Sequence, residues 1–447
     1  MNVVSAGILA VAALSSLWAV LAPRDKALPR AMSITIVLFV LIPTFGPSRA
    51  VSAVPVILSI ALLGIAMVRQ DTRRLHARNV LWTVIFVAFH ASTQIFNDSL
   101  LSLGLIGAQA LGLCLAAAAA SRLAAMGSTA ILTTIGVLVP LEALIALLEQ
   151  MRAIPYVWAR SLTATYTDIG FRNNEIASWL PGRSMGTFAH PILLGTFAAI
   201  AFVLCVVAFA GTRRWRWLLL AVVAAGTLSL SGTRSAAAGA LVALTLWLVF
   251  RRGSLLGLRI GAGLILVLIA VNLDQLTSSL FNSEVRNSTS YIHRTRVLSS
   301  IPAILDRDGL TFLFGSGAGS VEDLFSSGIV QGSSGYMFFD NQYVRLIALS
   351  GIVGLTLFFI AAARGFRVGN EASRAALVVV LVLMASFDTL TWNFSALMSA
   401  IFLSGAVPIR KTTAPADSTQ PQDSRAGRNL SVSPSSSPSL QERTAFG

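Results

Sequence analysis

Residues 191–211 read PILLGTFAAIAFVLCVVAFAG, an apolar run without a single charged side chain. A helix of about twenty such residues is long enough to cross the hydrocarbon core of a bilayer. Similar apolar runs recur along most of the 447 residues. The sequence therefore predicts an all-α protein, a polytopic bundle of transmembrane helices.

The composition also favours a membrane protein. The chain is 55% hydrophobic and 12% charged, with a mean hydropathy of +0.76, whereas a soluble protein carries roughly twice this charged fraction. In a soluble protein the net charge of +14 would indicate a nucleic-acid partner. Here most arginines lie in short loops between apolar runs, where positive charge fixes membrane topology. We therefore predict membrane lipids as partners and no nucleic acid.

Each apolar run bounded by charged or loop residues is interpreted as one crossing, which gives about 12 to 13 helices. The predicted spans are 3–22, 31–46, 50–68, 79–96, 102–120, 128–148, 191–211, 217–231, 235–250, 255–273, 345–363, 374–390 and 394–409.

Positive charge distinguishes the two sides of the membrane. The loops after odd-numbered crossings hold most of the arginines, and the short loops on the other side hold only Arg49 and Arg234. By the positive-inside rule the arginine-rich loops are cytoplasmic. The two long connections, about 149–190 and 274–344, are then extracytoplasmic, and the membrane is the cytoplasmic (inner) membrane.

The rest of the composition sets further limits. Residues 1–411 form one predicted transmembrane domain, and the Ser/Pro-rich residues 412–447 are predicted to be a disordered cytoplasmic tail. Cys114 and Cys205 lie inside apolar runs, and the four histidines are scattered along the chain. We predict no disulfide, no metal site and no cofactor.

Two arginines mark the predicted external boundary of the membrane. Arg183 ends the first long loop, and Arg234 lies in a short turn where the positive-inside rule does not require an arginine. A guanidinium binds phosphate oxygens in a bidentate manner, so both residues are candidates for binding an anion. The structural alternatives are a snorkelling anchor for Arg183 and an ion pair of Arg234 with Asp340 or Glu175.

The second long loop adds His293, Arg294 and Arg296, followed by a predicted helix at about 295–306. Its glycine-rich stretch at 314–319 lacks the strand and the Gly-Lys-Ser/Thr of a nucleotide site, so it predicts a tight turn. Loops of this length are usually functional. The sequence thus indicates chemistry at the external surface.

An ordered set of motifs on this side resembles the bacterial O-antigen ligase and O-antigen polymerase family over roughly residues 180–360. The motifs are Arg183-x-x-Gly186-Thr187, Ser231-x-x-Arg234, Gly315-x-Gly317, Asp340-Asn341-x-Tyr343 and Gly351-x-x-Gly354.

The resemblance implies a GT-C-like membrane glycosyltransferase that works without a metal ion. Its donor would be an oligosaccharide linked to undecaprenyl pyrophosphate, and its acceptor a hydroxyl of a glycan or lipid. In such enzymes, arginines matching Arg183 and Arg234 hold the pyrophosphate, and we extend this role to Arg294 or Arg296. The implied process is surface polysaccharide biosynthesis.

The sequence departs from the ligases of this family at one position. They typically carry a histidine before the Asn of the closing motif, and this chain has Asp340. A carboxylate can also act as general base toward an acceptor hydroxyl. Asp340 is therefore the predicted catalytic residue, with His190 and His293 as alternative bases, and ligation and polymerisation both remain open.

Two other classes of function compete with a transferase. A transporter or flippase for a lipid-linked glycan or another anionic substrate needs charged residues inside its helices. Apart from Glu142, and Arg259, Arg345 and Asp388 near helix ends, the predicted crossings carry almost none. A non-catalytic scaffold is the third alternative.

Overall fold

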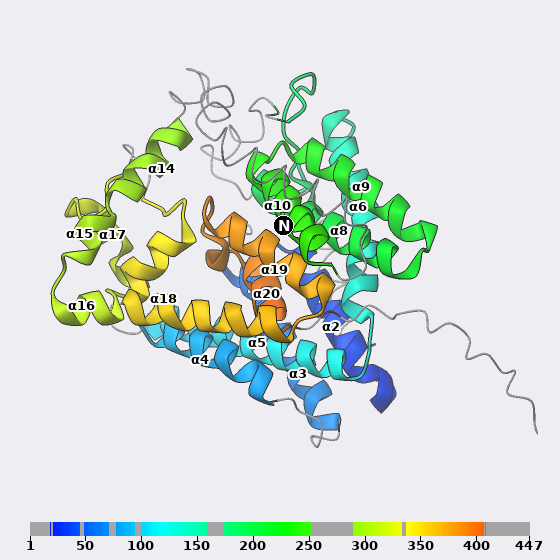
Figure 1. Ribbon diagram of the computed structural model, residues 1–447, viewed down its shortest axis with the longest axis horizontal. Coiled ribbons are helices and arrows are strands. Elements are labelled where there is room, and N and C mark those ends of the chain that lie inside the picture. Colours follow the sequence, from blue (N-terminus) through cyan, green and yellow to red (C-terminus); the bar gives the residue numbers. More distant parts are fainter. Residues whose placement is uncertain are drawn as a thin grey trace, which may run out of the picture. The chain divides into compact units, whose positions relative to one another are not determined.

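The computed structural model describes residues 18, 21–44, 49–70, 77–93, 100–158, 174, 176–251, 289–332, 337–405 and 407. Within these ranges every regular element is a helix, and the protein is all-α as predicted (Figure 1). The longer helices are α2 (Arg24–Leu41), α3 (Arg49–Arg69), α4 (Ala77–Thr93), α5 (Leu100–Ala125), α6 (Ala130–Gln150), α8 (Pro191–Thr212), α9 (Trp215–Ser231), α10 (Arg234–Phe250), α14 (Thr289–Ser299), α18 (Gln342–Val368), α19 (Glu371–Met384) and α20 (Asn393–Leu403). The short ones are η4 (Gly186–Phe188), α15 (Ile301–Leu305), α16 (Gly309–Phe314), η5 (Ala318–Ser320), α17 (Val321–Ser326) and η6 (Thr389–Thr391).

Five of the described helices, α3, α5, α6, α8 and α18, contain segments long and apolar enough to cross a membrane. Shorter apolar helices accompany them in α4, α9, α10 and α20. The chain is therefore a helical membrane protein with several crossings. The first and tenth predicted crossings, 3–22 and 255–273, lie outside the described residues, as does the predicted tail at 412–447.

The predicted spans mostly coincide with helices, but three of them end five or six residues too late. α2 ends at Leu41 instead of 46, α19 ends at Met384 instead of 390, and α20 ends at Leu403 instead of 409. The predicted limits followed apolar character, and Phe387 is indeed apolar and buried although it lies in a turn. A buried side chain can pack from a turn as well as from a helix, so hydropathy alone places such ends poorly.

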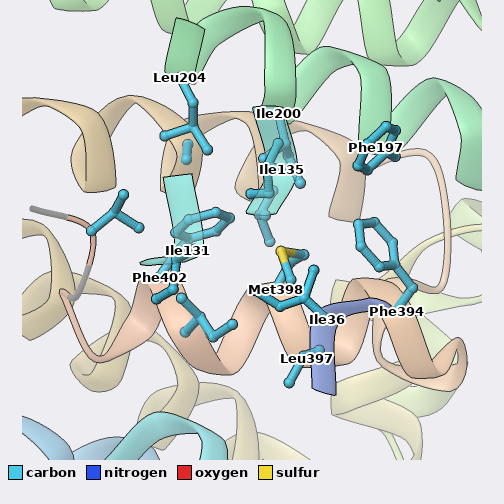
Figure 2. Close-up of a cluster of buried hydrophobic side chains, with 14 of the residues drawn as sticks. Ile36, Ile131, Ile135, Phe197, Ile200, Leu204, Phe394, Leu397, Met398 and Phe402 are labelled. Atoms are coloured by element: carbon cyan, nitrogen blue, oxygen red, sulfur yellow. The ribbon is translucent and has the colours of Figure 1, made fainter. Parts of the chain in front are cut away.

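A hydrophobic core joins α8 to helices from distant parts of the chain. The apolar window of α8 is 78% buried, against 33% for those of α3 and α5, so α8 is a central helix. It contacts α6, α9, α10, α19 and α20. Figure 2 shows the side chains of α2, α6, α8 and α20 that pack together, namely Ile36, Ile131, Ile135, Phe197, Ile200, Leu204, Phe394, Leu397, Met398 and Phe402.

The segment from α14 to α17 lies beside the first turns of α18 and shares a separate core with them (Figure 1). Its buried residues are Val297, Ile304, Leu324, Val330, Phe339, Val344, Ala348 and Leu349. The predicted single helix at 295–306 is wrong, because α14 and α15 meet at Ser300. Pro302 lacks a backbone N–H and therefore starts a new helix rather than continuing α14.

α18 is interrupted at Gly351, whose φ of 65° and ψ of −171° are not helical. The loop after α16 bonds to the carbonyls that the interruption exposes. The N–H of Ser316 donates to the Ala348 carbonyl at 3.1 Å, and the N–H of Gly317 to that of Leu349 at 3.0 Å. The glycine-rich stretch at 314–319, predicted as a tight turn, therefore also supplies hydrogen-bond donors to the carbonyls at the break in α18.

Arg307 and two glycines complete this contact. The Arg307 guanidinium donates to the carbonyls of Ile347 and Ala348, each at 3.1 Å. Gly315 and Gly351 have φ values of +77° and +65°, and a Cβ on either would overlap the backbone of the other segment. Neither position accepts a side chain without moving the main chain.

The ends of the helices form two faces. The end of α6, the loop before α8, the end of α9, the start of α18 and the α19–α20 connection contact one another, and we call this the site face. On the opposite face Arg251 after α10 lies 3.9 Å from Glu371 at the start of α19. This grouping matches the prediction that successive loops lie alternately on the two sides of the membrane. That the site face is the extracytoplasmic one remains a prediction of the positive-inside rule.

We expect Gly315→Ala and Gly351→Ala to destabilise the protein strongly. A positive φ alone costs a non-glycine residue about 1–3 kcal/mol, and the overlap with backbone adds to it. Gly226→Ala in α9, where a Cβ meets nothing within 4 Å, is the matched control and should leave the melting temperature in detergent unchanged or slightly raised. Equal melting temperatures for wild type and both variants would contradict this account of the break.

Candidate functional site

Arg183 lies against the turn between α9 and α10. Its Nε donates to the Ser231 carbonyl at 2.9 Å and its Nη2 to Thr233 Oγ1 at 3.0 Å. The residue is only 8% exposed, so it does not snorkel into water but binds the end of α9. Gly232, with a φ of +63°, leaves room for the aliphatic part of Arg183, because a Cβ there would lie 3.1 Å from its Cγ.

The same turn carries Arg234, the first residue of α10, which is exposed. The structure thus brings the two predicted anion-binding arginines to one turn, one buried and one exposed. Of the two alternative partners of Arg234, Asp340 pairs with Arg294 instead. Glu175 lies outside the described residues.

Two carboxylates of α6 hold the loop that follows Arg183. Glu149 Oε2 accepts from the N–H groups of Met185 and Gly186 at 2.8 and 2.9 Å. Glu142 Oε2 accepts from the Thr187 N–H at 3.0 Å, and its Oε1 from the Thr187 hydroxyl at 2.6 Å. Three consecutive N–H groups that would otherwise lack helical partners are thereby satisfied by two buried acids.

Glu142 therefore has a structural explanation. It is the intramembrane charge on which the transporter hypothesis depended, and both of its oxygens bond to Thr187. Gly186, with a φ of +59°, is required at this contact because a Cβ would overlap Glu142 Oε2. The Arg183-x-x-Gly186-Thr187 motif is the segment that these two carboxylates fix at the start of α8.

The Asp340-Asn341 motif opens α18. Asn341 Oδ1 accepts from the N–H groups of Tyr343 and Val344 at 2.9 and 3.1 Å, which caps the helix. Its Nδ2 donates to the Ala385 carbonyl at 2.8 Å and so ties α18 to the end of α19. Asp340 Oδ2 lies 3.2 Å from Nε of Arg294 on α14.

A second acid and arginine lie next to this pair. Arg345 Nη1 is 3.6 Å from Asp388 Oδ2, and Trp392 Nε1 donates to Asp388 Oδ1 at 3.2 Å. Asp388 follows α19 and is 7% exposed. The pKa of Asp388 is raised to about 6, chiefly by burial and to a smaller extent by the charge of Asp340, while Arg345 and the hydrogen bonds to Asp388 act in the opposite direction.

His190 joins the two halves of the site face. Its ring lies 5.1 Å from the Trp392 ring, and its Nδ1 accepts from the Ile192 N–H at 3.2 Å and caps α8. The next residue, Pro191, accepts through its carbonyl from Thr233 Oγ1 at 3.1 Å. A continuous series of contacts therefore runs from Arg183 through Thr233 and Trp392 to Asp388.

The remaining candidates occupy other positions. Arg296 is exposed and donates to the Gly332 carbonyl at 3.2 Å, away from this series. His293 Nε2 bonds to the Phe338 carbonyl at 2.8 Å, and its ring stacks on Phe325. These contacts give His293 a structural role.

The sequence named Arg345 and Asp388 only as charges near helix ends, and Trp392 not at all. Arg345 and Asp388 could be noticed because a charged residue within or near a membrane is costly, so it is usually functional or paired with another charge. Their partnership could not be inferred, because 43 residues separate the two charges. Within the described ranges no three His, Cys, Asp or Glu side chains are close enough to share a metal ion.

Comparison with known proteins adds no relative. No protein-family model matches this chain, and no curated protein matches it.

We expect Thr187→Val to destabilise the protein by about 1–3 kcal/mol, the cost of leaving a buried polar group unpaired. The change keeps the shape of the side chain and removes the hydroxyl that bonds to Glu142 and to the Val40 carbonyl. Thr196→Val in α8 is the matched control, since the Thr196 hydroxyl bonds to the Ile192 carbonyl of its own helix. Thermal unfolding in detergent should show a clearly larger loss for Thr187→Val, and equal losses would contradict a stabilising role for the bonds of Thr187 to Glu142 and Val40.

Proposed function

We propose that this protein is a metal-independent membrane glycosyltransferase of the O-antigen ligase or polymerase type. It would transfer a glycan from undecaprenyl pyrophosphate to an acceptor hydroxyl at the outer face of the cytoplasmic membrane. The observation that carries the proposal is the contact series on the site face. It joins segments around 183, 233 and 388 that the sequence separates by up to about two hundred residues, and Asn341, beside Asp340, is tied to Ala385 at the same end.

The charges of this face suit a pyrophosphate leaving group. When the anomeric C–O bond breaks, its electron pair remains on the diphosphate, and fixed guanidinium groups stabilise the charge that develops. Arg234 is exposed at the turn that Arg183 holds. In this proposal Arg234 meets the donor, Arg183 fixes the turn and supports its positive potential, and Arg294 lies at the acceptor end.

We assign the acceptor proton to Asp388 rather than Asp340. The Asp340 carboxylate already accepts a charge-assisted hydrogen bond from Arg294 at 3.2 Å, so its Oδ2 is engaged. The arginine of Asp388 is farther away, at 3.6 Å. A base with a pKa of about 6 is mostly ionised at neutral pH and still accepts a proton effectively.

Glu142 no longer favours transport, because it is bound to Thr187. A flippase would nevertheless meet the same anionic headgroup, so the test must detect a new bond. Purified protein in phosphatidylcholine vesicles, given a lipid-linked oligosaccharide donor and an acceptor glycan, should form a new glycosidic linkage. Movement of the donor across the bilayer without linkage would refute the transferase proposal.

Replacing the arginines tests their roles. We expect Arg234→Lys and Arg183→Lys each to lower transfer about 10- to 100-fold, because an ammonium loses the paired hydrogen bonds of a guanidinium. Arg152→Lys is the matched control, since Arg152 is exposed beyond the end of α6 on the same face. Unchanged transfer in Arg234→Lys, at equal protein level, would remove Arg234 from the site.

The pH profile tests the base. With Asp388 as base, activity is present above about pH 6 and is lost as the pH falls below it. Trp392→Phe removes a donor that lowers this pKa, so the acid limb should move to higher pH. Asp340→Asn removes a like charge and should move the limb to lower pH.

Asp388→Asn should lower kcat by about 10²- to 10⁴-fold, the usual contribution of a general base. The measurement is kcat from pH 4.5 to 8 in the reconstituted assay. If the acid limb of the pH profile disappears in Asp340→Asn and persists in Asp388→Asn, Asp340 rather than Asp388 is the base.

A further inference from the structure

The outward side of α16 is apolar. α16 contains no charged residue, and its side chains Leu310, Leu313 and Phe314 are 71%, 39% and 45% exposed. The spacing i, i+3, i+4 places them on one stripe of the helix. A helix in contact with water normally turns such a stripe toward the core. Here Thr311 and Phe312, between them, are the half-buried positions.

The position of α16 along α18 is fixed by hydrogen bonds at the break. Ser316 and Gly317, just after α16, bond to the Ala348 and Leu349 carbonyls, immediately before Gly351. The part of α18 beyond the break, 351–368, is about 27 Å long at 1.5 Å per residue. This length alone nearly matches a hydrocarbon core of about 30 Å. The break, and α16 with it, therefore lies at the membrane boundary.

The end of α4 independently marks the same height relative to the membrane. Its last turn bonds to the residue before the break, with His90 Nδ1 2.7 Å and Thr93 Oγ1 3.2 Å from Ser350 Oγ. The Phe89 ring lies 6.4 Å from the Phe314 ring of α16. An apolar helix thus ends where α16 packs. The first turns of α18 belong to the core that it shares with α14 to α17, which lies beyond this level.

We propose that α16 is an interfacial helix whose apolar stripe enters the lipid leaflet on the site face and anchors the segment from α14 to α17 to the membrane. The partner is the acyl region of phospholipids near their headgroups. Lipid is favoured over a protein partner because the apolar stripe of α16 lies at the same height as the end of α4 and the break in α18, where these two helices leave the bilayer. This anchor would hold Arg294 of α14 at a constant height above the membrane, whatever reaction the protein performs.

The experiment uses the full-length protein with Cys114 and Cys205 replaced by Ala and one new cysteine carrying a fluorophore. The test variant is Leu310→Cys, at the most exposed position of the stripe. Val222→Cys on α9, 63% exposed, is the lipid control, and Asp323→Cys, exposed on α17, is the water control. Each is reconstituted in phosphatidylcholine vesicles with or without brominated acyl chains, and iodide is added from the water.

We expect the Leu310 label to lose most of its fluorescence in brominated vesicles, as the Val222 label does, and to resist iodide. The Asp323 label should be quenched by iodide and should keep its fluorescence in brominated vesicles. Quenching of the Leu310 label by iodide and not by bromine would overturn the proposal by placing α16 in water. Resistance of the label to both quenchers, with disulfide-linked dimers of the unlabelled Leu310→Cys protein under oxidising conditions, would overturn it in favour of a second copy of the chain.

Discussion

The hydrocarbon interior of a membrane accepts no unpaired backbone N–H or carbonyl, and the architecture of the site face follows from this constraint. At three places where the described chain leaves helical geometry here, a polar side chain from another segment bonds to the main chain. Glu142 and Glu149 accept from the N–H groups of 185–187. Arg183 donates to the end of α9, and Arg307 donates to the carbonyls before the break in α18. At these places buried charge satisfies the backbone of interrupted helices.

This use of charge makes the site face rigid. A carboxylate or guanidinium that bonds to a main chain fixes its position and orientation, and in a medium of low dielectric such a bond is costly to break. Arg183 is thereby held under the turn that presents Arg234, while Asn341 ties the start of α18 to the end of α19. A set of fixed dipoles and cations is what an enzyme needs in order to stabilise charge that appears only in the transition state. The same rigidity would serve the recognition of an anionic headgroup.

The two acid and arginine pairs differ in their environment. Asp340 and Arg294 join the start of α18 to α14 and are partly open to solvent, whereas Asp388 and Arg345 lie deeper, with Trp392 between them and His190. Burial and the neighbouring Asp340 both favour the protonated form of Asp388. Carboxylates whose surroundings differ in this way are commonly assigned different roles in acid–base chemistry. The proposed separation of roles between Asp340 and Asp388 rests on that difference.

The sequence by itself determined the helical class, the location of most helices and the grouping of their ends into two faces, because apolar runs and arginine-rich loops are local properties that respond directly to a bilayer. It also selected Arg183, Arg234, Arg294 and Asp340. Only the tertiary structure decided how these residues are used: Arg183 as a partner of backbone, Asp340 as a partner of Arg294, and Glu142 as a ligand of Thr187. Such partnerships join side chains that are tens of residues apart, and hydropathy contains no information on which helices will lie side by side.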